Sequence, residues 1–293
     1  MKQGDHTVRS IRGAFQDELK GLYDVEEINS ILYILFEDFR GWPRTKLHTE
    51  PGTLIGIEYS AKFMDALERL SNGCPVQYIT GKTRFNEIQL IVNPSVLIPR
   101  PETAELAMLI VKKTVPLVKN GFSAIDIGTG SGCLAIYLRK HLPLDYMRGT
   151  DISEDALKVA SSNAAACGLE IDFLRSDILL ECDEPVNKKF NLVVSNPPYV
   201  TMKERAAMRS NVMDYEPHEA LFVPDDAPLK YYKAVAAHAG NCLEEEGVLW
   251  FEINEAYGKE LMEMLEASGF SDICLLHDFH GRDRFMKAVF RSR

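Results

Sequence analysis

Short apolar runs alternate with helical stretches throughout the chain after Gly121, and this alternation limits the possible folds more than any other feature. The runs have the length of buried strands and occupy residues 123–127, 146–150, 171–174, 192–194 and 248–253. Helical patterns separate them at residues 134–141, 156–167 and 229–243. The alternation predicts an α/β fold, a parallel sheet with helices on both faces. Ligands of such sheets bind beyond the carboxyl ends of the strands, so the residues after each run are the candidates for chemistry.

The first 75 residues carry a helical pattern instead. Apolar residues from Asp24 to Phe39 recur at spacings of three and four, which predicts an amphipathic helix with Asp24 as its N-cap. Gly41-Trp42-Pro43 ends this helix, and a further helix is expected at residues 58–70. The block lacks any catalytic spacing, so we interpret it as a unit that docks a partner or only packs.

The spacing of the apolar residues changes after Gln77 from a helical to a strand-like period. Further along the chain, a helix is expected at residues 102–115. Between these points, two short strands around Gly81 and Asn86 are predicted from the apolar residues Tyr78, Ile79, Phe85, Ile88, Leu90 and Val92. The sequence therefore predicts a β-hairpin linker between the helical block and the α/β domain.

Composition argues against several classes of protein. The chain has 33 basic and 43 acidic side chains, a net charge of −10, and affinity for nucleic acid comes mainly from Lys and Arg contacts to phosphate. The six cysteines lie at least 15 residues apart, which gives no metal-ligand spacing and is typical of reduced thiols. No apolar run approaches the roughly 20 residues that cross a bilayer. We therefore expect a cytoplasmic monomer that binds neither metal, membrane nor nucleic acid.

A glycine-rich segment follows the first apolar run and leads directly into a helix. Asp126-Ile-Gly128-Thr-Gly130-Ser-Gly132 has the spacing G-x-G-x-G, with an acidic residue two positions before it. A dinucleotide fingerprint requires a glycine three residues after Gly130, but Cys133 stands there. The segment is similar to the loop of Rossmann-like S-adenosylmethionine methyltransferases; an ordinary tight turn is the alternative.

Acidic residues follow the next two runs. Asp151 stands at the tip of the second strand, where a carboxylate can accept both hydroxyls of a ribose. Its alternative role is to cap the following helix, for which Ser153 is an equally good candidate. After the third run, Asp177 is placed to accept from an adenine amino group and Ile178 to pack on the adenine face, although Asp177 also fits a solvated turn.

The fourth run ends in Asn196-Pro197-Pro198-Tyr199. Proline fixes φ, lacks an N–H and forces the preceding residue into extended backbone, so this segment is a rigid shelf that offers hydrogen-bond acceptors. The Asn196 side-chain carbonyl and a proline backbone carbonyl suit a planar NH₂ group, which has two N–H bonds to donate. Tyr199 adds an aromatic face and a hydroxyl.

The glycine loop and the Asn-Pro-Pro-Tyr shelf together resemble methyltransferases that act on NH₂ nitrogens of adenine, cytosine or glutamine. Flanking segments narrow the resemblance to the bacterial PrmC/HemK family. They are Gly73–Gly81 (G-x-P-x-Q-Y-I-x-G), Val96–Thr103 (L-I-P-R-P-E-T), Tyr215–Leu221 (Y-E-P-x-x-A-L) and Gly281–Phe285 (G-x-x-R-F). They occur in the family's order from about residue 73 to the C-terminus.

The resemblance implies a fold and an activity. The fold is a class I (Rossmann-like) S-adenosylmethionine methyltransferase domain at residues 96–293, a β-hairpin linker at 76–95 and an N-terminal helical substrate-docking domain at 1–75. The activity is methyl transfer from S-adenosylmethionine to the side-chain amide nitrogen (N5) of the glutamine in the Gly-Gly-Gln motif of class 1 peptide chain release factors. The alternative is a DNA or RNA amino-methyltransferase of the adenine-N6 type with the same shelf.

The resemblance also implies the site residues. The cofactor residues would be Gly128, Thr129, Gly130, Ser131, Gly132, Asp151, Ile178 and Asn196, to which position in the sequence adds Asp126 and Asp177. The substrate residues would be Asn196, Pro197, Pro198 and Tyr199, with Asn196, the Pro197 carbonyl and Tyr199 in catalytic roles. Two positions depart from the family pattern: Ile178, where some relatives have an aromatic residue, and Asn254, where glycine is common. Catalysis is expected from positioning and electrostatics, without a metal.

Overall fold

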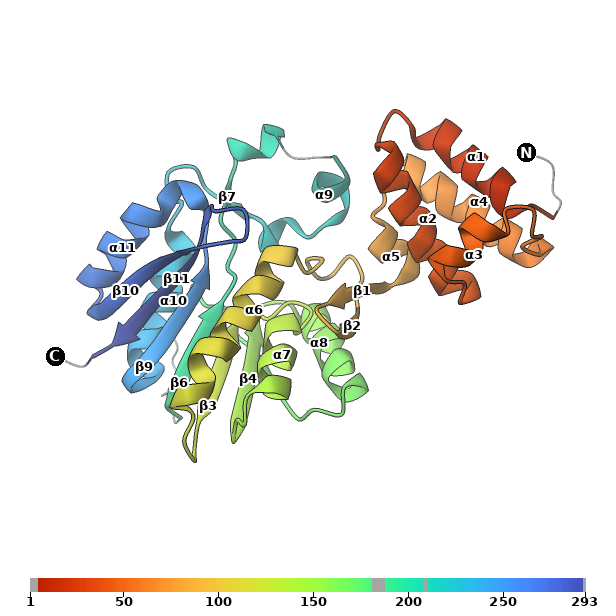
Figure 1. Ribbon diagram of the computed structural model, residues 1–293. Coiled ribbons are helices and arrows are strands. Elements are labelled where there is room, and N and C mark those ends of the chain that lie inside the picture. Colours follow the sequence, from red (N-terminus) through yellow and green to blue (C-terminus); the bar gives the residue numbers. More distant parts are fainter. Residues whose placement is uncertain (1–4, 181–187, 208–209, 292–293) are drawn as a thin grey trace. The chain divides into compact units, whose positions relative to one another are not determined.

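A computed structural model describes residues 5–180, 188–207 and 210–291 of the chain (Figure 1). The chain divides into two compact units. One consists of Met1–Lys82 with Arg209–Tyr215, and the other of Thr83–Met208 with Glu216–Arg293.

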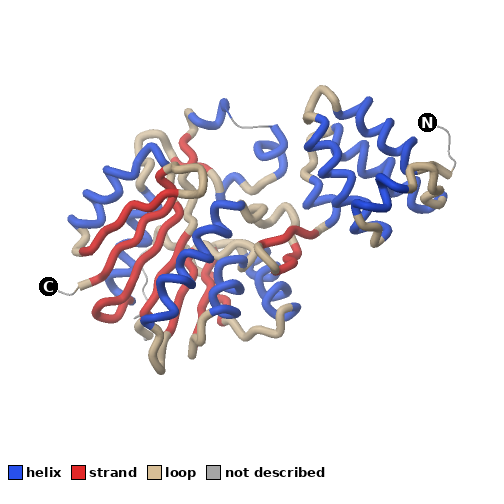
Figure 2. Tube along the Cα trace, viewed as in Figure 1, coloured by secondary structure: helices blue, strands red, loops and turns tan. Residues whose placement is uncertain are grey.

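The first unit is helical (Figure 2). Its helices are α1 (Val8–Leu19), α2 (Val25–Arg40), α3 (Arg44–Thr49), α4 (Ile57–Ser71), α5 (Val76–Thr80) and α9 (Ser210–Tyr215). The α2 and α4 helices confirm the two helices predicted from periodicity. The Asp24 side chain caps α2 by accepting from the Glu27 backbone N–H at 2.8 Å, and Gly41 ends it with φ +63°. A core of buried side chains from α1, α2 and α4 holds this unit together.

The predicted hairpin is present but starts later than expected. Its strands are β1 (Lys82–Phe85) and β2 (Ile88–Ile91), and Asn86 takes φ +51° in the turn. The expectation of strand at Tyr78 and Ile79 is wrong, because both lie in α5. This helix is preceded by Pro75 and ends at Gly81, whose φ of +69° reverses the chain before β1.

The second unit contains the α/β sheet. Among the described residues the sheet has seven strands in the order β10-β11-β9-β6-β3-β4-β5. They are β3 (Ser123–Ile127), β4 (Tyr146–Asp151), β5 (Asp172–Arg175), β6 (Phe190–Ser195), β9 (Leu243–Glu252), β10 (Phe270–His277) and β11 (Asp283–Phe290). The pairs β3–β4, β3–β6, β4–β5 and β6–β9 are parallel, as predicted. The strands β10 and β11 were not predicted and extend this sheet at one edge, where β11 runs antiparallel to both β9 and β10.

Helices cover both faces of this sheet (Figure 1). On one face, α6 (Pro101–Thr114), α7 (Cys133–His141) and α8 (Glu154–Ala166) pack over a core that includes Leu192, Val194 and Trp250. On the other face, α10 (Lys230–Cys242) and α11 (Gly258–Ala267) pack over Val193 and Phe251. Adjacent residues of β6 thus point into opposite cores, which explains why Leu192, Val193 and Val194 are all apolar.

Short elements complete the chain. They are the parallel pair β7 (Val200–Thr201) and β8 (Phe222–Val223), and the 3₁₀ turns η1 (Val115–Leu117), η2 (Glu204–Ala207), η3 (His218–Ala220) and η4 (Glu255–Tyr257).

The strand ends are tied to one another at the carboxyl edge of the sheet. The backbone N–H groups of Gly128 and Thr129 both donate to the Thr150 carbonyl at 2.8 Å, which joins the ends of β3 and β4. The Ser195 hydroxyl donates to the Ile127 carbonyl at 2.7 Å, which joins β6 to β3. Because β3 lies between β4 and β6, strand order reverses here, and this is where α/β sheets bind ligands.

Candidate active site

A cavity of about 460 Å³ opens at this edge, entirely within the second unit. Its volume lies in the range of about 300–1,000 Å³ that small-molecule sites occupy. Most of the residues predicted from the sequence line it, namely Gly128, Thr129, Gly130, Ser131, Asp151, Asp177, Ile178, Asn196, Pro197 and Pro198. Asp126, Gly132 and Tyr199 lie outside this lining.

Asp126 supports the glycine loop from below. It is buried, and its Oδ2 accepts from the Thr129 hydroxyl at 2.7 Å and from the Ala135 backbone N–H at 3.2 Å. Burial raises the pKa of Asp126 to about 7. Its contacts connect the loop to the first turn of α7, so the structure places this carboxyl in a supporting position rather than at the predicted cofactor surface.

Glycine is required at two positions of the loop for different reasons. Gly130 has φ +53°, a left-handed conformation that side chains disfavour, and its N–H donates to Asp151 Oδ2 at 2.9 Å. Gly132 has φ +81°, and a Cβ there would lie 3.1 Å from the Ala160 Cβ. Gly132 therefore permits close packing of the loop against α8 and lies behind the cavity wall.

Asp151 projects from the end of β4 into the cavity lining. Its Oδ2 holds the Gly130 N–H, and its Oδ1 accepts from the Ser153 N–H at 3.0 Å. The helix cap is Ser153, whose hydroxyl accepts from the Ala156 N–H at 3.2 Å, so capping of α8 does not depend on Asp151. Burial raises the pKa of Asp151. The two oxygens have about four lone-pair sites, so acceptor capacity remains beside the backbone contacts from Gly130, Ile152 and Ser153 and is available for ribose hydroxyls.

Asp177 and Ile178 line the cavity beyond the end of β5. The Asp177 Oδ1 accepts from the Leu179 N–H at 2.9 Å and so fixes its own turn. Tyr231 of α10 lines the same cavity and was missed by sequence reasoning. Its position in an ordinary helical pattern gave no signal, although it supplies the aromatic ring that Ile178 lacks.

The Asn-Pro-Pro shelf leaves the end of β6. Asn196 lines the cavity, and its Nδ2 donates to the Thr103 hydroxyl oxygen at 3.1 Å. No described residue donates to its other terminal atom, Oδ1, which remains the acceptor of this side chain. Pro197 and Pro198 continue the wall. The structure therefore places Asn196, Pro197 and Pro198 side by side in the cavity lining.

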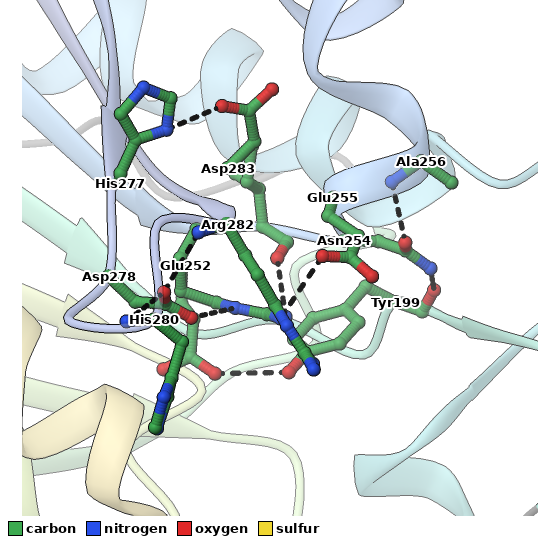
Figure 3. A network of polar contacts seen from close by, with 12 residues as sticks. Tyr199, Glu252, Asn254, Glu255, Ala256, His277, Asp278, His280, Arg282 and Asp283 are labelled. Atoms are coloured by element: carbon green, nitrogen blue, oxygen red, sulfur yellow. Dashed lines mark hydrogen bonds and ion pairs between the residues drawn. The ribbon is translucent and has the colours of Figure 1, made fainter.

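Tyr199 occupies a different place from the one expected (Figure 3). Its hydroxyl donates to Glu252 Oε1 at 3.0 Å, and its backbone carbonyl accepts from the Asn254 side-chain NH₂ at 3.2 Å. Its ring packs against the core beneath α10 and α11. Burial next to Glu252 raises the pKa of Tyr199 well above its ordinary value, so the hydroxyl stays protonated as a donor. The structure thus gives Tyr199 contacts that hold the shelf from behind.

Four further residues around the site were not predicted from the sequence. Glu252 and Asn254, at the end of β9, bind the Tyr199 hydroxyl and carbonyl. Arg100 pairs with the buried Glu216 at 2.7 Å, and Glu216 Oε2 also accepts from the Ile98 N–H. Both Arg100 and Glu216 lie in segments that carry the family resemblance, and that resemblance was the only available signal.

The described residues contain neither a candidate metal site nor a candidate membrane-spanning helix. No cluster of three or more His, Cys, Asp or Glu side chains with the geometry of a metal site occurs among them. No described helix combines the length and apolar character needed to span a membrane.

Family models and solved structures define the structural class to which the second unit belongs. Residues 107–215 match the family model of the methyltransferase small domain, and residues 14–81 match the PrmC N-terminal domain. A methyltransferase from Pyrococcus furiosus superposes with a TM-score of 0.52 at 14% identity, covering 78% of this chain and 99% of that one. The T. thermophilus 16S rRNA N2 G1207 methyltransferase, solved with AdoMet and guanosine, gives 0.51 at 18% identity over 72% and 50%. The second unit thus has the class I methyltransferase fold.

Relatives that align over nearly the whole chain define the family. Release factor glutamine methyltransferases are 38% identical in Flavobacterium psychrophilum, over 97% of this chain and 99% of the relative, and 36% identical in Bacteroides thetaiotaomicron, over 95% and 98%. The Bacillus subtilis relative is 34% identical over 90% and 91%. The chain belongs to the release factor glutamine methyltransferase family.

Proposed function

We propose that this protein transfers a methyl group from S-adenosylmethionine to the side-chain amide nitrogen of the glutamine in the Gly-Gly-Gln motif of a class 1 peptide chain release factor. The observation that carries the proposal is the Asn196 amide at the cavity wall. Its NH₂ is bound to Thr103 and its carbonyl oxygen is left as an acceptor. The nearly full-length relatives support the release factor over nucleic acid as the substrate.

The cavity residues fit the cofactor. S-adenosylmethionine supplies the methyl group on a cationic sulfur. Asp151, with acceptor capacity left beside its backbone contacts, would hold the ribose hydroxyls, while Asp177, Ile178 and Tyr231 would surround the adenine. The backbone of Gly128–Ser131 would cradle the amino-acid portion. In this arrangement Asp126 acts indirectly, by fixing the loop.

The substrate amide is a poor nucleophile, because its nitrogen lone pair is delocalised into the carbonyl group. Asn196 Oδ1 and the Pro197 carbonyl would accept its two N–H bonds and so fix the plane of the NH₂ group. The same two acceptors would stabilise the positive charge that develops on nitrogen as its bond to the methyl carbon forms and the bond from that carbon to sulfur breaks, leaving a neutral thioether. One N–H proton then leaves to water. Tyr199 keeps the shelf rigid through Glu252, and its ring need not touch the amide.

The remaining parts of the proposal concern the setting of the reaction. We expect a cytoplasmic monomer whose helical first unit docks the release factor and whose second unit carries out the chemistry. The net charge of −10 favours a protein partner over a nucleic acid. Docking by the helical unit agrees with a separate core and with cavity-lining residues that all belong to the second unit.

Transfer of labelled methyl groups tests the function. Purified protein is incubated with methyl-labelled S-adenosylmethionine and a class 1 release factor, its Gly-Gly-Gln→Gly-Gly-Ala variant, tRNA, ribosomal RNA or DNA. We expect label only in the intact release factor, on the glutamine side chain as located by peptide mass spectrometry. Label in a nucleic acid, or in the alanine variant, would refute the proposed substrate.

A further inference from the structure

A chain of polar contacts leads from the core of the second unit to Asn196. Glu252 is 1% exposed at the end of β9, and each of its oxygens accepts one hydroxyl. The Tyr199 hydroxyl donates to Oε1 at 3.0 Å (Figure 3), and the Thr103 hydroxyl donates to Oε2 at 2.6 Å. Thr103 in turn accepts from the Asn196 Nδ2 at 3.1 Å. The described contacts therefore run from Glu252 through Thr103 to Asn196.

The direction of this chain follows from the donors available. Burial raises the pKa of Glu252, whereas the Thr103 and Tyr199 hydroxyls and the charge of Arg284 favour its ionised form. In that form the carboxylate can only accept, and a hydroxyl has one proton. The 2.6 Å separation between Thr103 and Glu252 falls in the range of about 2.5–2.7 Å for a hydroxyl bound to a carboxylate. The single proton of Thr103 is therefore committed to Glu252, and only lone pairs of its oxygen face Asn196.

The lone pairs of Thr103 select one of the two orientations of the Asn196 amide. With Nδ2 toward Thr103, a hydrogen bond forms; with Oδ1 toward Thr103, two acceptors would face each other without a proton. In the selected orientation the atom left over is the carbonyl oxygen. In the other orientation, the Asn196 NH₂ would lie at the cavity wall. It would face the substrate NH₂, and two donors cannot form a hydrogen bond.

We infer that Thr103 and Glu252 are positioning residues that lock the Asn196 amide with its carbonyl oxygen as the acceptor for the substrate. The inference rests on the proposed function, in which Asn196 accepts from the glutamine amide. It assigns a task to the last residue of the Val96–Thr103 segment and to the acidic residue of Glu252-Ile-Asn254.

The test compares substitutions of one threonine with a matched control. Thr103→Val keeps the shape and removes the hydroxyl, Thr103→Ala removes it with less bulk, and Thr103→Ser restores it. Thr114→Val is the control, because Thr114 is also a buried threonine of α6 but lies at the far end of the helix. Single-turnover rates of methyl transfer to a release factor are measured with cofactor and substrate at saturation, together with cofactor Kd and Tm.

We expect the Val and Ala variants to react about 10- to 100-fold more slowly, the range for an unsatisfied buried partner. Thr103→Ser and Thr114→Val should stay near the unmodified rate, and cofactor Kd should not change. Unreduced rates in the Val and Ala variants would overturn the inference. So would a Ser variant as slow as Val, since the loss would then come from the methyl group.

A double-mutant cycle gives an independent readout. If Thr103 acts through Asn196, Thr103→Val should cause no further loss in an Asn196→Ala background, whereas independent effects would multiply. A multiplied loss would overturn the inference even if Thr103→Val alone is slow. Failure of the proposed function is distinguishable, because then the unmodified protein would not methylate the release factor.

Discussion

At the scale of single residues, some of the predicted side chains line the cavity and others lie behind it. Their positions in the sequence do not distinguish these two groups. Asp126 and Asp151 both end strands, but only Asp151 reaches the cavity lining. Asp126 is turned under the loop by contacts to Thr129 and Ala135. The distinction depends on which way each carboxyl leaves its strand.

Substitution of Asp151 tests the cofactor site. Asp151→Ala should weaken S-adenosylmethionine binding by about 1.5–3 kcal/mol, because hydrogen bonds to a charged acceptor are lost. Titration calorimetry measures the change, with Asp17→Ala, an exposed carboxyl of the first unit, as the control. Unchanged affinity in Asp151→Ala would remove this residue from the site.

The buried carboxyl of Asp126 predicts a pH dependence of stability. Its pKa of about 7 lies above the ordinary 3.8, so between these values the folded protein binds the proton more strongly than the unfolded chain. The contribution of this group to stability is therefore greatest below pH 4 and is lost as pH rises toward 7. The difference in unfolding free energy between the cofactor-free protein and Asp126→Asn should fall by up to about 4 kcal/mol over this window.

Urea unfolding at a series of pH values measures this difference. Glu252 also has a raised pKa, but it is present in both proteins, so its contribution cancels. A difference that is flat between pH 4 and pH 8 would show that Asp126 titrates at its ordinary pKa and that its burial has no such effect.

At the scale of secondary-structure elements, hydrogen bonds and apolar contacts hold the β1–β2 hairpin against the α/β domain. The Asn163 side chain of α8 accepts from the Ile91 N–H at 2.7 Å and donates to the Ile91 and Ser131 carbonyls at 3.0 and 2.9 Å. Phe85 and Ile88 enter the core below α6 and α7. One buried amide thus connects the hairpin to the glycine loop, and the strands of this linker belong to the second unit.

Removal of that amide should destabilise the second unit. Asn163→Ala leaves the Ile91 N–H and the Ile91 and Ser131 carbonyls without this partner and should lower the free energy of unfolding by about 2–3 kcal/mol. Asn241→Ala, an exposed asparagine at the end of α10, is the matched control. Equal stability of the two variants in urea unfolding would contradict this role for Asn163.

The sequence predicts those helices and strands whose pattern of apolar residues matches the burial of the element in the fold. Strands β3 and β6 were predicted because burial on both faces makes most of their residues apolar. The β10–β11 hairpin was not, since only Phe270 of β10 is buried and the remaining residues of that strand are half-buried or exposed. The site residues on loops after strands were found by position, whereas Thr103, Glu252 and Tyr231 come from other elements. Their proximity is a consequence of packing, which local patterns do not encode.

At the scale of the whole molecule, the chain has two compact units, and each has a core of its own. The first has its own helical core, and the cavity draws its lining entirely from the second. We therefore expect recognition of the intact substrate and the chemistry to be separable by experiment.

Truncation tests this separation. Deletion of residues 1–75 should raise KM for an intact release factor and leave cofactor affinity nearly unchanged. A short Gly-Gly-Gln peptide, which lacks the rest of the release factor, serves as the matched substrate, and its KM should not change. An unaltered KM for the intact release factor would make the helical unit a packing unit only.

The most direct test of the whole account is the single-turnover rate of methyl transfer to the release factor glutamine by Asn196 variants. Asn196→Ala removes the side-chain acceptor and should lower the rate by about 10²–10³, with cofactor Kd and Tm little changed. Asn196→Asp should also be nearly inactive, because its carboxylate cannot donate to Thr103, whose proton is held by Glu252. The account predicts two slow variants that still bind cofactor; a fully active Asn196→Ala protein would contradict it.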